Sequence, residues 1–253
     1  MLNNEFLQKY YFPVKEDNVY VPDTTGAIAH AEGFKAIVRE DNGHVIHVAK
    51  ETYKLVRNQQ VIESGLEELE RLGFKYQVDE NHSFVDAERM RLSLVFPDIK
   101  IRDNGTDINM SMYLHNSYNE SEGVRAIFGA IRSICTNGMI IGTLLGKYYR
   151  RHTQGFQIAE LEKMFNTAFD KLPQVQARIE ALKTLYPSKE FLEEAEKAVG
   201  KKMMETVQEN SEHKVENSDM WKLYNAITYV ISHAIMVRQR ARYQMAVSKL
   251  FKL

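Results

Sequence analysis

The spacing of apolar and polar residues divides the chain into a first half rich in predicted strands and a second half rich in predicted helices. The segments FKAIVRE and HVIHVAK flank the turn Asp41-Asn42-Gly43, and Asn-Gly supplies the positive φ angles that a tight hairpin requires. Apolar residues then recur at helical spacing through residues 58–72, and Gly73 follows as a stop signal. The pattern therefore predicts a hairpin followed by one helix.

Three more strands are predicted before residue 118, in the segments FKYQVD, ERMRLSLVF and DINMSMYLHNS. The second of these ends at Pro97 and alternates apolar with polar residues, so one of its faces is expected to be buried. A run of strands followed by a run of helices favours an α+β fold. We expect an antiparallel sheet of about five strands with a crossing helix, followed by a helical C-terminal half.

From residue 121 onward the apolar spacing predicts helices. Val124, Ile127, Phe128, Ile131 and Ile134 follow a helix period. Further on we expect amphipathic helices over residues 157–185 and 188–209, the second starting at Ser188, and one long helix over residues 219–250 with Asp219 as its N-cap. The first half of that long helix is apolar nearly all round, which indicates burial or a position between partners.

The N-terminal residues 1–32 contain Pro13, Pro22 and Gly26 and are expected to be irregular, an arm that packs on the body or on a neighbouring subunit. The resulting division is an arm over residues 1–32, an α+β core over 33–155, and a helical region over 156–253 that packs on the core.

The composition is that of an ordinary globular protein, with 44% hydrophobic and 26% charged residues. Cys135 is the one cysteine, so an internal disulfide is impossible, which fits a reducing compartment such as the cytoplasm. The N-terminus does not have the pattern of a signal peptide, and no apolar run reaches the length of a membrane span. We therefore expect a cytoplasmic protein without a membrane partner.

The net charge of −1 conceals a strong asymmetry. Residues 1–120 carry 13 basic and 20 acidic side chains, a net charge of −7, and residues 121–253 carry 20 and 14, a net charge of +6. Two basic segments, residues 123–159 and 220–253, contain no acidic residue. A localised positive field favours phosphate-bearing partners. The alternative is that these cations pair with the acidic first half when the chain folds.

Signals for catalysis are weak. The segment GTLLGKYY lacks the glycine spacing and the Ser or Thr of a phosphate-binding loop. The histidines are scattered, and His44 and His47 would face opposite sides of a strand, so no metal site is predicted. Cys135 has no evident basic partner and reads better as a buried, inert thiol. We expect no enzyme activity, no cofactor and no metal.

The segment YLHNSYNESEGVRAIFGAIRSICTNGM, residues 113–139, is the densest cluster of turn-forming and basic residues. Gly123 and Gly129 allow close approach of another backbone. On a helix, Arg125 and Arg132 would point the same way because they are two turns apart. They could bind phosphate or be solvated at the connection of a strand to a helix.

Two short segments combine cations with aromatic residues or with helical spacing. KYYRRH interleaves tyrosines with cations, as single-strand nucleic-acid grooves do, although a basic helix end with inward tyrosines has the same composition. RQRARY could contact phosphate, the acidic half of a neighbour, or only water. Candidate nucleic-acid-binding residues are Arg125, Arg132, Lys147, Tyr148, Tyr149, Arg150, Arg151, Arg238 and Arg242.

The segment over residues 113–139 resembles the "NSHDGS…R…R.VC.N" core of a phage- and plasmid-associated family, domain of unknown function 932. ETYKLVRNQQVIE and WKLYNAITYVISH resemble its early and late segments, so the resemblance spans roughly residues 34–250. The chain departs from the family pattern at Tyr118-Asn119-Glu120-Ser121, where His-Asp-Gly-Ser is typical. This resemblance supplies no established catalytic residues.

At the level of the fold, the predicted order of elements is also similar to phage single-strand annealing proteins. That similarity implies ATP-independent binding of single-stranded DNA in a basic groove of a ring or filament, and it is an analogy of folds only. We therefore expect an oligomeric protein of a mobile genetic element that binds and anneals single-stranded DNA. The alternative is a phage or plasmid factor that binds a host protein and has no nucleic-acid activity.

Overall fold

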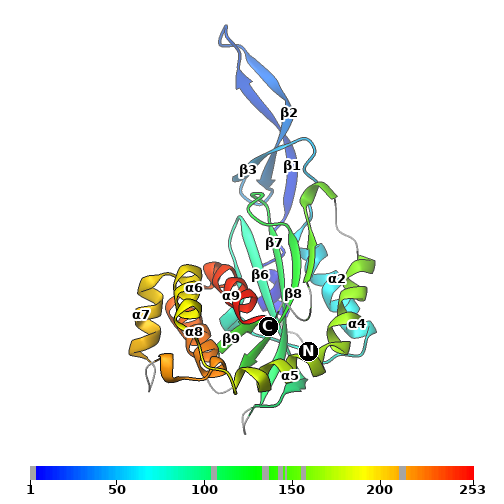
Figure 1. Cartoon of the computed structure of the whole chain (residues 1–253). Helices are drawn as coiled ribbons and strands as arrows, with labels where there is room; N and C mark the ends of the chain where they lie inside the picture. The colour runs from blue at the N-terminus through cyan, green and yellow to red at the C-terminus, as the bar shows by residue number, and fades with distance from the viewer. Residues whose placement is uncertain are drawn as a thin grey trace.

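The structure is a computed structural model that describes residues 4–103, 107–132, 137–141, 145, 147–154, 158–210 and 215–253. Within these residues, two antiparallel sheets and a set of helices form a body from which one long hairpin projects (Figure 1). The expected mixture of antiparallel sheet and helices, with helices dominating the C-terminal half, is confirmed.

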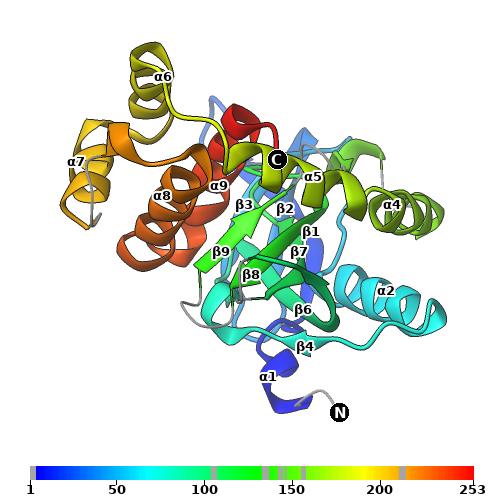
Figure 2. The same ribbon diagram turned by 60° about the horizontal axis from the view of Figure 1, so that its bottom comes forward.

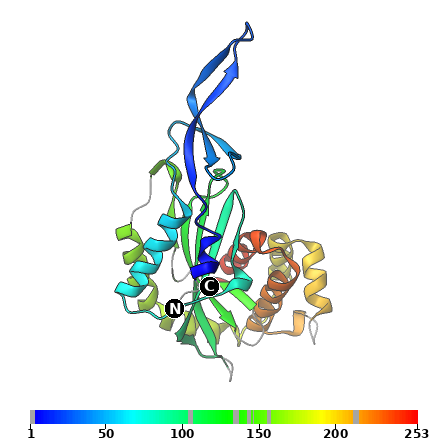
Figure 3. The same ribbon diagram turned by 180° about the vertical axis from the view of Figure 1, so that it is seen from behind.

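The projecting part is a three-stranded antiparallel sheet, and we call its residues 14–50 the arm (Figures 1 and 3). The predicted hairpin is confirmed, with Gly43 at a φ of 70° in the turn between β2 and β3. The expectation of an irregular N-terminal segment is wrong, because Pro22 ends a strand and Gly26 lies in the turn that follows it. The strands are β1 (Val14–Pro22), β2 (Ile28–Arg39) and β3 (Val45–Lys50).

A larger, seven-stranded antiparallel sheet forms the centre of the body, with the strand order β10-β8-β7-β6-β4. β5 also pairs with β6, and β9 pairs with the second half of β8, whose first half pairs with β10. This sheet is larger than the five strands expected, although the predicted hairpin lies in the other sheet, because β8 was predicted as a helix and β5, β9 and β10 are too short to produce an alternating pattern. The strands are β4 (Gln77–Val78), β5 (Phe84–Val85), β6 (Arg89–Ile101), β7 (Ile108–Ser117), β8 (Val124–Arg132), β9 (Asn137–Ile140) and β10 (Lys147–Arg150).

The prediction of a helix that starts near residue 121 is wrong, since residues 124–132 form the strand β8. Ala126 and Phe128 face one side of the sheet while Ile127 faces the other, and all three are buried. A strand covered on both faces carries apolar residues at nearly every position, and over a short run this resembles a helical pattern. The inference that Arg125 and Arg132 share a helix face is therefore also wrong.

Several predicted helix boundaries are confirmed by capping geometry. The Ser188 hydroxyl accepts a hydrogen bond from the Phe191 amide at 3.2 Å, and the Asp219 carboxylate accepts one from the Lys222 amide at 2.8 Å. The α-helices are α1 (Asn4–Gln8), α2 (Asn58–Arg71), α4 (Ile158–Asp170), α5 (Leu172–Leu182), α6 (Lys189–Val199), α7 (Lys201–Glu209), α8 (Met220–Ala234) and α9 (Val237–Phe251). Short 3₁₀ helices are η1 (Glu80–His82), η2 (His152–Gln154) and η3 (Val215–Asn217).

The single long helix expected over residues 219–250 is broken into α8 and α9. Ile235 is extended, with φ −108° and ψ 136°, and its carbonyl accepts a hydrogen bond from Arg240 Nε at 2.8 Å. Nη1 of Arg240 donates to the Asn81 carbonyl at 3.1 Å. These contacts turn α9 back across the sheet, which places its basic residues differently from those of a straight helix.

Helices cover both faces of the large sheet (Figure 2). On one face α2 and α4 complete the main core, where Phe128 of β8 packs edge-on against Phe165 and Phe169 of α4. On the other face α8 and α9 pack against β9, and Met245 of α9 lies against a small apolar cluster. Helices α6 and α7 pack outside α9 and α8. Side chains alternate between these two faces along each strand.

Across the described residues, none of the helices combines the length and the hydrophobicity required for a transmembrane span.

Candidate nucleic-acid interface

Strand pairing places three of the predicted residues on one face of the sheet. In the antiparallel pair of β10 and β8, Tyr149 lies opposite Arg125 and Lys147 lies opposite Ile127. Residues directly opposite each other in such a pair project to the same face. Arg125, Lys147 and Tyr149 therefore point away from α2 and α4.

Helix α9 packs on this same face and carries an exposed arginine. Met245 of α9 packs against Tyr113 and Ile127, which occupy the same cross-strand row as Lys147. Arg242, one turn before Met245, is exposed. We call Arg125, Lys147, Tyr149 and Arg242 the basic face. It combines cations from both of the acid-free segments of the sequence.

The charges of this surface are only partly neutralised. Within the described part of the chain, Lys147, Arg151 and Arg242 form no ion pair. The Arg125 guanidinium lies 5.2 Å from the centre of the Tyr149 ring, a cation–π contact that holds the half-exposed ring in place. An exposed aromatic ring beside cations can stack on a base while the cations contact phosphates.

Other predicted residues are not part of this surface. Tyr148 is only 4% exposed and points to the core on the opposite face, where its amide donates to Met164 Sδ at 3.0 Å. Arg150 is paired with Glu160, its Nε lying 2.8 Å from Oε2. Alternation along β10 separates these two residues from Lys147 and Tyr149, so the KYYRRH segment does not act as one patch.

Arg238 and Arg132 are also separate from the basic face. Arg238, at the start of α9, lies 3.7 Å from the carboxylate of Asp86, which offsets its charge. Arg132 ends β8, and its side chain falls outside the described residues. Cys135 lies outside the described residues as well.

The turn from Tyr118 to Gly123, which joins β7 to β8, is held by the Asn116-Ser117 pair before it. The Asn116 amide donates to the Val56 carbonyl at 2.8 Å and to Asn58 Oδ1 at 2.9 Å, which ties the strand to the start of α2. The Ser117 hydroxyl donates to the Glu122 carbonyl at 2.6 Å and accepts from its amide at 3.1 Å. These two residues fix the shape of the turn.

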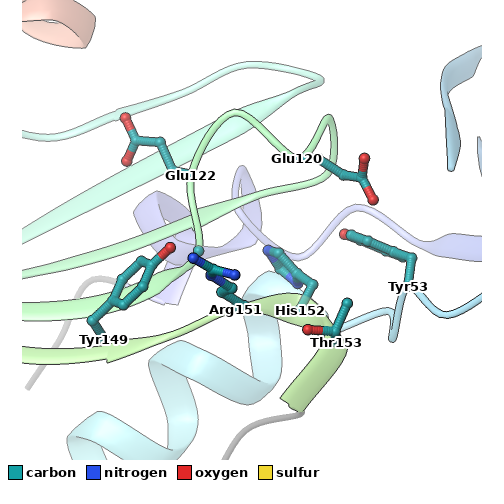
Figure 4. Close-up of a pocket in the computed structure, with 8 residues that line it drawn as sticks. Tyr53, Glu120, Glu122, Tyr149, Arg151, His152 and Thr153 are labelled. Carbon is teal, nitrogen blue, oxygen red and sulfur yellow. The ribbon is translucent and has the colours of Figure 1, made fainter. Parts of the chain in front are cut away.

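A pocket of about 270 Å³ opens beside this turn, and we call it the turn pocket (Figure 4). Gly123 lets β10 approach, because a Cβ there would overlap the Arg150 carbonyl oxygen. The close approach expected at this glycine is confirmed. In Figure 4 Glu120 projects from the turn toward the side of Tyr53, and Glu122 projects the other way. The lining residues are Tyr53, Glu120, Glu122, Gly123, Tyr149, Arg151, His152 and Thr153.

His152 is a buried polar group of the turn pocket. It is 5% exposed and stacks on Tyr53 with ring centres 4.8 Å apart. Burial lowers its pKa, an effect that the neighbouring backbone of Lys54 and Glu122 opposes only in part. Among the described residues, neither ring nitrogen has a well-aligned hydrogen-bond partner. The imidazole is therefore a buried, neutral group whose contacts with these backbone groups are poorly aligned.

The two carboxylates of the turn pocket are in different states. Glu122 lies 3.5 Å from His115 Nδ1 and 4.0 Å from Arg89. Burial would raise the pKa of Glu122, but His115, Arg125 and Arg89 outweigh it and the pKa is lowered. Glu120 has one long contact, 3.5 Å to His47 Nε2, and its carboxylate is 44% exposed. Glu120 is therefore the carboxylate with free acceptor capacity.

Sequence reasoning missed a buried polar row on the face that α9 covers. Arg91 is fully buried, lies 4.0 Å from the centre of the Tyr113 ring, and donates from Nη2 to Gln244 Oε1 at 3.2 Å. Burial lowers the pKa of Arg91. An arginine at an alternate position of a strand reads as solvent-facing, and only the return of α9 buries it. The pocket residues Tyr53, Glu120, Glu122, His152 and Thr153 were likewise not predicted as site residues.

Metal ligation has no support in the geometry of the described residues, which contain no cluster of three or more His, Cys, Asp or Glu side chains able to hold an ion.

Comparison with known proteins gives one finding. No curated protein and no solved structure matches the chain. The model of one family matches residues 45–251, from the start of β3 to the end of α9, and the chain therefore belongs to the family "Domain of unknown function (DUF932)".

Proposed function

We propose that the chain is a protein of a mobile genetic element that binds single-stranded DNA and anneals complementary strands without ATP, as an oligomer in the cytoplasm. The observation that carries the proposal is the basic face, where Arg125 and Lys147 share a sheet face with one exposed tyrosine ring and Arg242 is exposed on the helix that packs on this face. Arg125, Lys147, Arg151 and Arg242 contact phosphates, and Tyr149 stacks on a base. The mobile-element setting rests on the resemblance of the sequence.

The number of available cations sets the salt dependence. Arg125, Lys147, Arg151 and Arg242 give four phosphate contacts, so log K should fall with log salt with a slope of about −3 for a single strand. That corresponds to a loss of about 50-fold between 50 and 200 mM salt. The measurement is fluorescence anisotropy of a labelled 30-nucleotide strand at four salt concentrations.

A pair of variants separates the basic face from general charge. The double variant Lys147→Ala/Arg242→Ala should halve the slope to about −1.4, because two of the four phosphate contacts are lost. Lys201→Ala, an exposed cation at the start of α7, removes a charge far from β10 and should leave the slope unchanged. Absence of any single-strand binding at 50 mM salt refutes the proposal, and equal effects of the two variants refute the assignment to this face.

The oligomeric part of the proposal rests on the arm. Its outer ribbon is exposed on both faces and presents the apolar side chains of Tyr20, Val21 and Ile28. Residues 16–34 contain four carboxylates and no Lys or Arg; Asp17 and Glu16 pair with the flanking Lys15 and Lys35, and the two carboxylates nearer the tip disfavour a phosphate-bearing partner. The complementary occupant is the basic second half of another copy of the chain, in a head-to-tail assembly.

Light scattering of the full chain tests this assembly. The variants Tyr20→Asp and Ile28→Asp change exposed side chains, so the fold is retained while the apolar contact is lost. We expect a larger species for the unchanged chain and a monomer for the double variant. A monomer in both cases refutes the self-association.

The alternative function is that of a protein-binding factor without nucleic-acid activity, and the arm is the observation that favours it. The apolar segment over residues 221–237, for which the sequence allowed a position between partners, offers little surface. Trp221, Tyr224 and Ile227 are buried in the core, and its exposed large apolar side chains are Tyr229 and Met236. A chain that binds no single-stranded DNA, stays monomeric, and captures a host protein after nuclease treatment only when Tyr20 and Ile28 are intact would have this second function.

A further inference from the structure

We propose that the turn pocket receives one base of the bound strand and prefers a base with an exocyclic amino group, through the carboxylate of Glu120. This inference rests on the proposed single-strand binding and assigns a role to a cavity beside the basic face. Tyr149 belongs to both surfaces, so a strand stacked on this ring reaches the pocket without leaving the cations.

The size of the cavity sets the class of ligand. Pockets for drug-sized molecules measure roughly 300–1,000 Å³, and the turn pocket, at about 270 Å³, falls below that range. A single base with its ring atoms and one or two polar substituents suits this volume. The exposed ring of Tyr149 offers a flat face to a base, and the rings of Tyr53 and His152, which stack on each other, complete the aromatic lining.

The polar groups of the pocket match the edge of a base. Arg151 is the pocket's guanidinium donor and is free of ion pairs in the described part of the chain, so it can hold a flanking phosphate or a base carbonyl. The buried imidazole of His152 has a donor and an acceptor without well-aligned partners. Both ring nitrogens are buried from solvent, so Arg151 and Glu120 are the polar side chains that the pocket presents to a ligand.

Glu120 determines the preference among bases. A carboxylate accepts hydrogen bonds, so it attracts the amino groups of cytosine and adenine and repels the carbonyl at the corresponding position of thymine. Glu122 cannot replace it, because His115 and Arg89 already surround that carboxylate. The preference among bases should therefore depend on the side chain at position 120 alone.

The backbone at Glu120 supplies an independent observation. Its φ is 57°, in the left-handed region where residues other than glycine are uncommon. Glu120 therefore carries a charged side chain in a backbone conformation that favours glycine. Residues in such conformations cluster at ligand sites, where the strain is retained for binding.

The experiment measures the affinity of the full chain for 20-nucleotide strands of cytidine, adenosine or thymidine by fluorescence anisotropy. The unchanged chain should bind the cytidine strand at least about fivefold more tightly than the thymidine strand, the lower end of what one base contact contributes. Glu120→Gly should reduce this ratio to about one. Glu194→Gln, which removes an exposed carboxylate from α6, should leave the ratio unchanged.

The outcomes separate the inference from the proposed function. Removing any carboxylate near the strand raises affinity for all strands alike, so only the ratio between strands reports base recognition. Equal binding of all three strands by the unchanged chain, or an unchanged ratio in Glu120→Gly, overturns the pocket assignment and leaves single-strand binding intact. Failure to bind every strand overturns the proposed function itself.

Discussion

We predict that replacing Glu120 with glycine raises the stability of the fold, although the same change removes the preference among bases. Relief of the left-handed conformation is worth about 1–2 kcal/mol for a residue with a Cβ. Against this, the greater freedom of glycine in the unfolded chain costs about 0.5–1 kcal/mol. The contact with His47 is long and half exposed, so its loss costs at most a few tenths of a kcal/mol.

The three contributions leave a net stabilisation of about 0.5 kcal/mol. Urea unfolding followed by tryptophan fluorescence measures it, because Trp221 is buried against Tyr224 and reports on the body. The denaturation midpoint should rise while the m-value stays constant. A stabilised protein that discriminates less between bases would show that the side chain at position 120 is kept for the ligand rather than for the fold.

Two glycine substitutions serve as controls. Lys252 also has a positive φ, 56°, at the end of α9, so Lys252→Gly should stabilise the chain by a similar amount without changing base preference. Glu194 lies inside α6, where glycine costs about 1 kcal/mol, so Glu194→Gly should destabilise. A destabilised Glu120→Gly beside a stabilised Lys252→Gly would refute the assignment of strain to Glu120.

Three further predictions concern the sheet. Gly129→Ala should destabilise the chain by about 1–3 kcal/mol in urea unfolding, because the new methyl group would overlap the Met139 carbonyl oxygen; an unchanged midpoint would contradict the packing of β8. Burial holds the pKa of His115 below its ordinary value of 6.5, so the unfolded chain takes up the proton first and stability falls as the pH drops below about 6.5. Midpoints at pH 7.5 and 5.5 measure this loss, which should shrink in His115→Gln. Tyr149→Ala should weaken single-strand binding by about 1–3 kcal/mol and leave the fold intact. Tyr148→Ala should instead lower the free energy of unfolding by about 3–5 kcal/mol. The reverse result would show that Tyr148, and not Tyr149, is the exposed ring.

Elements with local signals could be predicted from the sequence. The hairpin at Asn42-Gly43 depends on backbone angles that only a few residue types adopt. The helix starts at Ser188 and Asp219 depend on side-chain oxygens that accept from amides three residues later. Such features depend on only a few neighbouring residues, so they can be predicted from the sequence.

Elements that depend on distant parts of the chain could not be predicted. β8 reads as a helix because α4 covers one of its faces and α9 the other, and neither helix is adjacent to it in sequence. Arg91 reads as exposed because Gln244, 153 residues away, is its partner. The break at Ile235 follows from contacts that Arg240 makes across the fold.

The candidate site shows the same division. By itself, the sequence determined that two segments are basic and free of acidic residues, since composition needs no fold. Only the tertiary structure decided that Lys147 and Tyr149 face α9 while Tyr148 enters the core, because side chains alternate along a strand and the pairing with β8 sets which face each one takes. The turn pocket, too, exists only where the turn before β8 meets the end of β10, which are brought together by the sheet and not by their spacing in the chain.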